Sequence, residues 1–142
     1  MRRLFALCLV TATLAACQQA ELGANDAWVR LPAVTGRPGA AYLTIRGGSE
    51  PTTLVAVSSP AAIRTELHEM KQEGGMMTMA PRRDVAVPAG QTVELKPGGI
   101  HVMLYDISPS VRAGSAVPLK LSFADGRVLE VSAKVKAAGD AD

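Results

Sequence analysis

The sequence predicts a single all-β domain, an antiparallel sandwich or small barrel of roughly seven to nine short strands. Short runs of β-type residues alternate with Pro/Gly turn signals, and the last two runs show a clean two-residue alternation of apolar side chains. No stretch keeps a 3.6-residue apolar period long enough for a core helix. With 142 residues, 48% hydrophobic and 20% charged, the chain has enough apolar content for one packed core and little length for a second domain.

The expected strands follow one another from Asp26 onward. They cover residues 27–31, 41–46, 53–58, 63–70, 76–79, 85–87, 91–95, 101–107, 117–123 and 128–135. The first ends in a loop rich in Pro and Gly, the second ends at Gly47-Gly48, and residues 60–64 have the length of one helical turn. Trp28 lies in the first strand, where we expect it in the core. Alternation places Leu119, Leu121 and Phe123 on one face of their strand, and Leu129, Val131, Ala133 and Val135 on one face of the last.

The N-terminal segment is typical of an export signal. Arg2-Arg3 precedes an apolar stretch, Leu4 to Leu14, that is too short to span a bilayer as a helix. Leu14-Ala15-Ala16-Cys17 then resembles a bacterial lipobox, in which the peptide is cut before the cysteine and the thiol is acylated. We therefore expect a lipoprotein signal peptide at 1–16, the lipidated Cys17 and a tether at 17–25, the domain at 26–136 and a flexible tail at 137–142. The alternative is an ordinary secretory signal that happens to contain a cysteine.

This reading of the N-terminus places the protein in the periplasm, anchored to a membrane by lipid. Gln18 follows the acylated cysteine, and this favours the outer membrane. The formal charge of +2 comes from Arg2 and Arg3, so the mature chain has 13 basic and 13 acidic residues. That balance argues against a nucleic-acid partner. Cys8 leaves with the signal and Cys17 is acylated, which removes every thiolate from the folded domain and excludes dithiol, Cys-nucleophile and blue-copper chemistry.

The residues with metal chemistry cluster in one part of the chain. They are the only two histidines, His68 and His101, and the five methionines that survive cleavage, Met70, Met76, Met77, Met79 and Met103. In the strand 63–70, Ile63 and Leu67 share the apolar face, so His68 and Met70 point away from the core.

His101 and Met103 likewise share a face of their strand, together with Tyr105. Gly74-Gly75 predicts a hairpin that could fold a thioether of Met76–Met79 over this site. A neutral thioether suits Cu(I) and not Mg²⁺, Ca²⁺ or Mn²⁺, and a zinc site with two methionines would be unusual. Four protein donors leave no open position for a substrate, and the chain shows no nucleophile–base motif, so we expect no enzyme activity.

The spacing of these residues resembles the periplasmic copper chaperone family PCu(A)C, the DUF461 domain. Ten residues separate His68 from Met79, twenty-one separate Met79 from His101, and one separates His101 from Met103. Further matching segments are Ala27–Arg30, Glu66–Glu69, Val87–Gly90 and Lys96–Leu104.

The resemblance implies a cupredoxin-like Greek-key β fold and one Cu(I) ion held by His68, Met79, His101 and Met103. It also implies copper delivery to an acceptor, a cytochrome c oxidase subunit or one of its assembly factors, by a protein we expect to be a monomer. The lipid anchor departs from the many soluble members of the family. The tail after Val135 has no His or Met, so we expect no second copper site there.

Several alternatives stay open at this stage. Met70, Met76 or Met77 could replace or assist Met79, and Tyr105 could line the site or only pack across strands. Arg64, Glu66, Arg82 and Arg83 are expected in a solvated rim that could instead orient a partner. The protein could buffer copper without a specific acceptor, or be a metal-free interaction module whose methionines merely pack. The sequence does not decide between Cu(I) and the chemically similar Ag(I).

Overall fold

A computed structural model describes residues 20–141 of the chain. The signal peptide predicted at 1–16, Cys17 with its predicted lipid and the last residue, Asp142, lie outside this range. No helix within the described range is long and apolar enough to cross a membrane.

The described residues form ten strands joined in one sheet. These are β1 (Gly23–Arg30), β2 (Gly39–Arg46), β3 (Thr52–Ser58), β4 (Ala62–Glu73), β5 (Met76–Pro81), β6 (Val85–Val87), β7 (Thr92–Leu95), β8 (Ile100–Ile107), β9 (Ala116–Phe123) and β10 (Val128–Lys136). All ten β-type runs form strands, one more than the upper number expected, and most strand ends differ from the expected ones by one to four residues. The helical turn considered at 60–64 is instead a short turn at Pro60-Ala61 that leads into β4.

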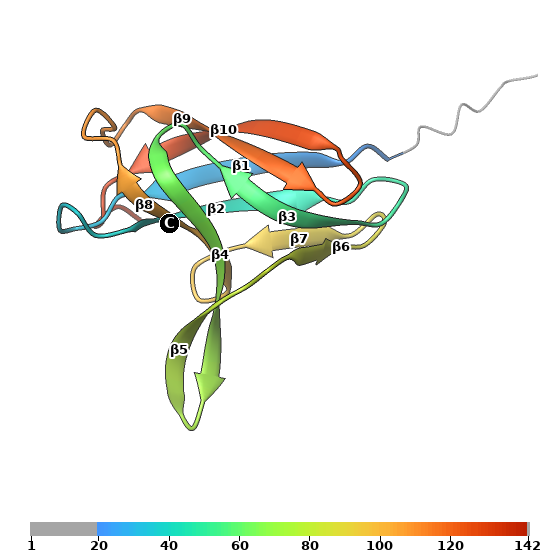
Figure 1. The fold of residues 1–142 in the computed structure, drawn as a ribbon, viewed down its shortest axis with the longest axis horizontal. Coiled ribbons are helices and arrows are strands. Elements are labelled where there is room, and N and C mark those ends of the chain that lie inside the picture. The colour runs from blue at the N-terminus through green and yellow to red at the C-terminus, as the bar shows by residue number, and fades with distance from the viewer. Residues whose placement is uncertain (1–19, 142) are drawn as a thin grey trace, which may run out of the picture.

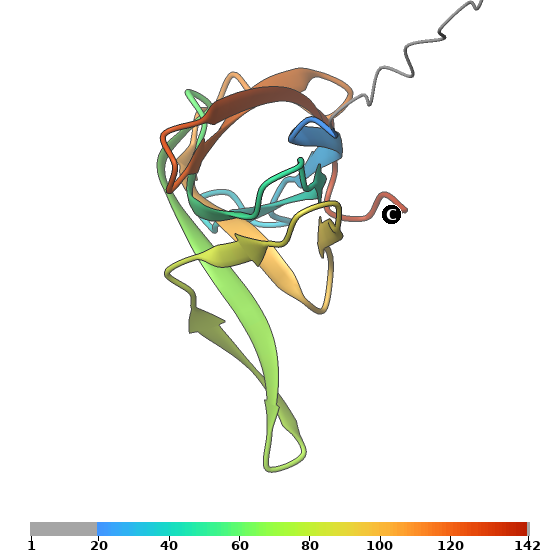
Figure 2. The same ribbon diagram turned by 90° about the vertical axis from the view of Figure 1, so that its right-hand side faces the viewer.

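The strand order is β5-β4-β8-β2-β1-β10-β9-β3-β6, and β7 pairs with β2 beside β8 (Figure 1). Seen end-on, the strands curl around a common interior, as a sandwich or barrel requires (Figure 2). One pair departs from the expected antiparallel arrangement, because β1 and β10 run parallel, with Val29 opposite Val135. The β9–β10 hairpin brings the last strand, β10, alongside the first strand, β1. The buried residues of β1 and β10 then point to the same interior.

Aliphatic side chains build the core, as the low aromatic content predicts. Leu119 and Leu121 of β9 are fully buried, and Ala133 and Val135 of β10 pack in the same cluster. Two expectations about the core are wrong. Ile63 is 85% exposed, since β4 begins at the rim of the sheet. Trp28 is half-buried outside the core, because its neighbours Ala27 and Val29 take the inward positions and turn the indole to the opposite face.

The N-terminal boundary also differs from the expectation. β1 begins at Gly23, so part of the segment assigned to the tether belongs to the sheet. Ser49 N donates a hydrogen bond to Ala20 O (2.8 Å), and Leu22 packs against the core. At the other end, Ala137 N donates to the Asp140 carboxylate (2.7 Å) in a turn that follows β10.

A long β-hairpin leaves the body of the domain (Figures 1 and 2). The first part of β4 pairs with β8, and its last residues pair only with β5. Gly74 and Gly75 make the turn with φ of +58° and +82°, a conformation that side-chain-bearing residues rarely adopt. The predicted hairpin is therefore present, and it projects from the point where the predicted metal-binding residues meet.

Candidate metal centre

The two histidines face each other across neighbouring strands. His68 of β4 is the register partner of His101 of β8, and their ring centroids are 6.1 Å apart. Side chains at paired positions leave a sheet on the same side, so the imidazoles share one face. They are only 7% and 5% exposed. Residues of the hairpin and of the loops before β8 and β2 line the cavity beside His101. The sequence predicted the shared orientation away from the core but not the burial.

The tautomer of His101 follows from its backbone partner. Its Nδ1 lies 3.0 Å from the carbonyl oxygen of Gly99, which can only accept a hydrogen bond. Nδ1 therefore carries the proton, and Nε2 keeps a free lone pair. The same carbonyl accepts a hydrogen bond from Met70 N (3.2 Å), which joins β4 to the turn before β8. A backbone oxygen thus orients the imidazole for binding through Nε2.

The tautomer of His68 is set by a carboxylate on the same strand. Its Nε2 lies 2.9 Å from Oε2 of Glu66, while Nδ1 is buried with no hydrogen-bond partner among the described residues. The hydrogen bond from His68 is the largest cause that holds the pKa of Glu66 below its usual range; burial opposes it, and the charge of Arg64 adds a smaller lowering effect. The ionised carboxylate only accepts, so Nε2 carries the proton. A buried nitrogen lone pair, that of Nδ1, is left without a partner, and such atoms are uncommon in folded proteins.

Three methionines and one histidine line a cavity of about 400 Å³ beside these rings. The lining includes Met70, Met79, His101, Met103 and the ring of Tyr42, together with the β1–β2 loop and Ala138. Met103 is 8% exposed and lies deep, whereas Met79 is 50% exposed. The ring of His68 stands beside His101 but does not line this cavity. The structure therefore brings three of the four predicted ligands to one cavity, with the fourth next to it.

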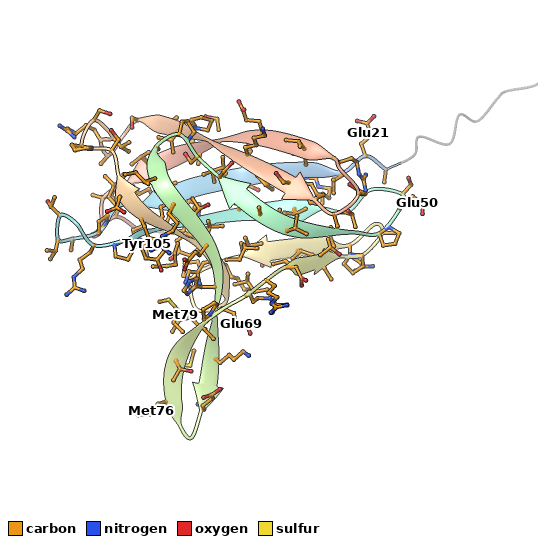
Figure 3. The ribbon with its side chains drawn as sticks, viewed as in Figure 1. Glu21, Glu50, Glu69, Met76, Met79 and Tyr105 are labelled. Carbon is orange, nitrogen blue, oxygen red and sulfur yellow. The ribbon has the colours of Figure 1, made fainter. Side chains whose placement is uncertain are left out.

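The hairpin brings Met79 to this cavity. Met70 and Met79 are register partners in β4 and β5, so their side chains leave the ribbon on the same side. Figure 3 shows Met79 at the base of the hairpin, near the body of the domain, and Met76 close to its tip. Met76 is 69% exposed and Met77 is 55% exposed, and neither lines the cavity. Of the three alternatives to Met79, only Met70 shares its cavity.

The polar residues around the site have specific partners. Arg64 forms an ion pair with Glu66, and its guanidinium lies 3.8 Å from the centre of the Tyr105 ring. Tyr105 itself does not line the cavity. Arg82 bonds to Glu69 at 2.5 Å, on the outer side of β4.

The donor set fits a soft cation that binds nitrogen and sulfur. Among residues 20–141, no group of three or more His, Cys, Asp or Glu side chains could hold a metal ion. Zinc and the hard cations rely on such groups. Two imidazoles with one free nitrogen each, next to three thioethers, form a site that suits Cu(I). A larger hollow, of about 790 Å³ beside Ile63, contains no His or Met.

Sequence reasoning missed the roles of two contributors, Glu66 and the Gly99 carbonyl. Glu66 was expected in the rim, although its position two residues before His68 on the same strand face was a usable signal. Met70 was already one of the alternatives to Met79, and the structure places it in the cavity. The Gly99 carbonyl gave no signal, because a backbone contact depends on the local turn and not on residue type.

The family model LpqE-like, described as "Putative lipoprotein LpqE-like", matches residues 22–135. The protein "Putative lipoprotein Lxx21020" of Leifsonia xyli subsp. xyli is 34% identical over 113 residues, which are 79% of this chain and 68% of that protein.

Solved structures show the same fold. The solution structure of the CuI form of DR1885 from Deinococcus radiodurans aligns with a TM-score of 0.60 at 31% identity, covering 86% of this chain and 83% of that one. The copper-bound PCuAC domain from PmoF2 aligns with a TM-score of 0.66 at 23% identity, covering 84% and 97%. These likenesses confirm the expected cupredoxin-like all-β fold and the resemblance to PCu(A)C domains.

Proposed function

This chain belongs to the LpqE-like lipoprotein family, and from that premise we propose that its domain binds one Cu(I) ion and hands it on to a copper acceptor. The ligands we propose are His68, Met79, His101 and Met103. The observation that carries the proposal is the pair of cross-strand imidazoles, each held by a hydrogen bond at one nitrogen with the other nitrogen free, beside a cavity lined by thioethers. The similarity to the CuI form of DR1885 supports the same cargo.

The site has features that suit transfer. All four proposed donors are neutral, so the ion keeps its charge and is not held by a strong ionic attraction. Thioethers bind more weakly than thiolates and form no disulfides in an oxidising compartment. Met79 is half-exposed at the base of the hairpin, so an incoming donor can replace it while His101 and Met103 still hold the ion. The role requires no enzyme activity.

The location proposed for this function is the periplasmic side of a bacterial membrane. Lipid on Cys17 would hold the domain there. Membership of a lipoprotein family supports this anchor, and Gln18 favours the outer membrane. The acceptor proposed is the copper site of cytochrome c oxidase or one of its assembly factors. The balanced charge of the mature chain agrees with a protein partner and not a nucleic acid.

Anaerobic titration of the folded domain with Cu(I), against a competing chelator, tests the binding. We expect one equivalent to bind to the parent domain, and His101→Ala and Met103→Ala each to weaken binding strongly. Met76→Leu is the matched control, because Met76 lies outside the cavity and should bind as the parent does. Failure of the parent to bind, or unchanged binding in His101→Ala, would show instead that the methionines serve packing or another partner.

A deletion strain separates delivery from buffering. Loss of oxidase activity under copper limitation, restored by added copper, is expected of a delivery protein. Copper sensitivity with normal oxidase activity would show that the protein buffers copper without a specific acceptor.

A further inference from the structure

We propose that Met70, Met77 and Met79 form an outer Cu(I) position on one face of the β4–β5 hairpin, through which the ion reaches and leaves the inner histidine site. This inference rests on the proposed function and adds a second, transient binding position to it. The ligand class is a soft monovalent cation, Cu(I) or Ag(I), held by thioethers alone.

The register of the hairpin places these three side chains on one face. Met70 is the partner of Met79, and Gln72 is the partner of Met77. Paired residues share a face, and residues two apart on a strand share a face, so Met70, Met77 and Met79 all project from the same side. Met76 pairs with Glu73 and falls on the opposite side. The four hairpin methionines therefore divide into a group of three and a single residue at the tip.

Packing does not explain the group of three. No methionine of the β4–β5 hairpin belongs to the apolar core cluster or to the partly buried side chains packed against it. Met77 and Met79 are 55% and 50% exposed. Methionine is mostly used to fill gaps in a core, and here it projects from a ribbon that has left the core. The side chains are therefore free to bind a soft ion.

The outer face is continuous with the inner site. Met70 and Met79 line the same cavity as His101 and Met103. Met77 lies one strand period further toward the tip, so its Cα is about 6.5–7 Å from that of Met79. Thioether side chains with three rotatable bonds can bridge that distance around one ion. An ion at the outer position thus already contacts Met79, a ligand proposed for the inner one.

Movement between the two positions needs only ligand exchange. One neutral donor replaces another, the copper stays Cu(I), and no proton is taken up or released, because thioethers carry none. The hairpin projects from the body (Figures 1 and 2), so a partner's donors can approach its face without contacting the buried histidines. The outer position lowers the barrier to exchange and leaves the stability of the inner complex nearly unchanged.

The first test compares Met77→Leu with Met76→Leu. Leucine keeps the size and apolar character of methionine and removes the sulfur. For Met77→Leu we expect an unchanged Kd for the first Cu(I) equivalent and a slower transfer of Cu(I) to an excess of chelator, by about 3- to 10-fold. Met76→Leu should match the parent in both. Transfer at the parent rate in Met77→Leu, or equal slowing in both variants, would overturn the proposal.

The second test observes the outer position directly. His101→Ala removes one ligand of the inner site and so weakens binding there. Ag(I) is added to this variant, labelled with ¹³C at the methionine methyl groups. We expect the methyl signals of Met70, Met77 and Met79 to shift, with that of Met76 unmoved. If the methyl signal of Met77 does not shift, although the parent protein binds one Cu(I) through His101, the outer position is overturned and the proposed function stands. A parent that binds no Cu(I) would overturn the proposed function as well.

Discussion

Glu66 is expected to hold His68 in the tautomer that leaves Nδ1 free for copper. Replacing it by alanine removes the acceptor 2.9 Å from Nε2. Without this hydrogen bond, the proton of His68 can move from Nε2 to Nδ1. The fraction of molecules with the proton on Nδ1 cannot bind copper through that nitrogen. Binding of Cu(I) should therefore weaken.

The expected increase in the Kd for Cu(I) depends on how exposed the Glu66 carboxylate is. Removing a group that orients a metal-binding histidine commonly weakens metal affinity by about 10- to 100-fold. The Glu66 side chain is 37% exposed, so water can partly replace it as an acceptor. We therefore expect the lower end, about 10-fold in Kd. Glu66→Gln should fall between the parent and Glu66→Ala, because its amide oxygen still accepts a hydrogen bond but carries no charge.

Glu69→Ala is the matched control. Glu69 is also near His68 in β4, but it pairs with Lys71 and Arg82 on the other face of the strand. Its replacement should leave the Kd unchanged. The assay is anaerobic chelator competition, with ¹⁵N shifts of the imidazole nitrogens to identify the tautomer and the bound atom. Tighter binding in Glu66→Ala would refute the reasoning, since it would show that the carboxylate competes with copper for Nε2.

Two further predictions concern the scaffold. Gly47→Ala places a methyl group 2.2 Å from the carbonyl oxygen of Pro88, so it should lower the free energy of unfolding, measured by urea titration, by about 1–3 kcal/mol. In the control Gly23→Ala the added methyl group meets nothing within 4 Å, and the free energy of unfolding should not fall. Equal destabilisation in the two variants would contradict this prediction. The hydrogen bonds of Arg127 hold the pKa of Asp125 well below its usual range, so this pair stabilises the fold above the unfolded-state pKa and loses that contribution as the pH falls toward the folded-state value. Asp125→Asn should thus lower the Tm at neutral pH and make it less sensitive to acid; a parallel Tm–pH curve would show that the pair contributes nothing.

Local patterns in the sequence predicted much of the site. The two-residue period of a strand is a local property, so His101 and Met103 had to share a face, and Gly74-Gly75 had to turn the chain. The same period placed His68 and Met70 together. The position of the strands and the all-β class followed from turn signals, and the pattern of spacings carried the resemblance to the copper chaperones.

Tertiary structure decided the rest, because register and burial depend on the whole sheet. No local pattern specifies that His68 pairs with His101, since that register is fixed by which faces of β4 and β8 must be buried. The half-exposed position of Trp28 depended on the buried neighbours Ala27 and Val29, not on its own apolar character. The sequence alone determined which donors this protein has and which of them share a strand face. Only the folded sheet determined which nitrogen each histidine leaves free, because the Gly99 carbonyl and the Glu66 carboxylate act through contacts made in the folded chain.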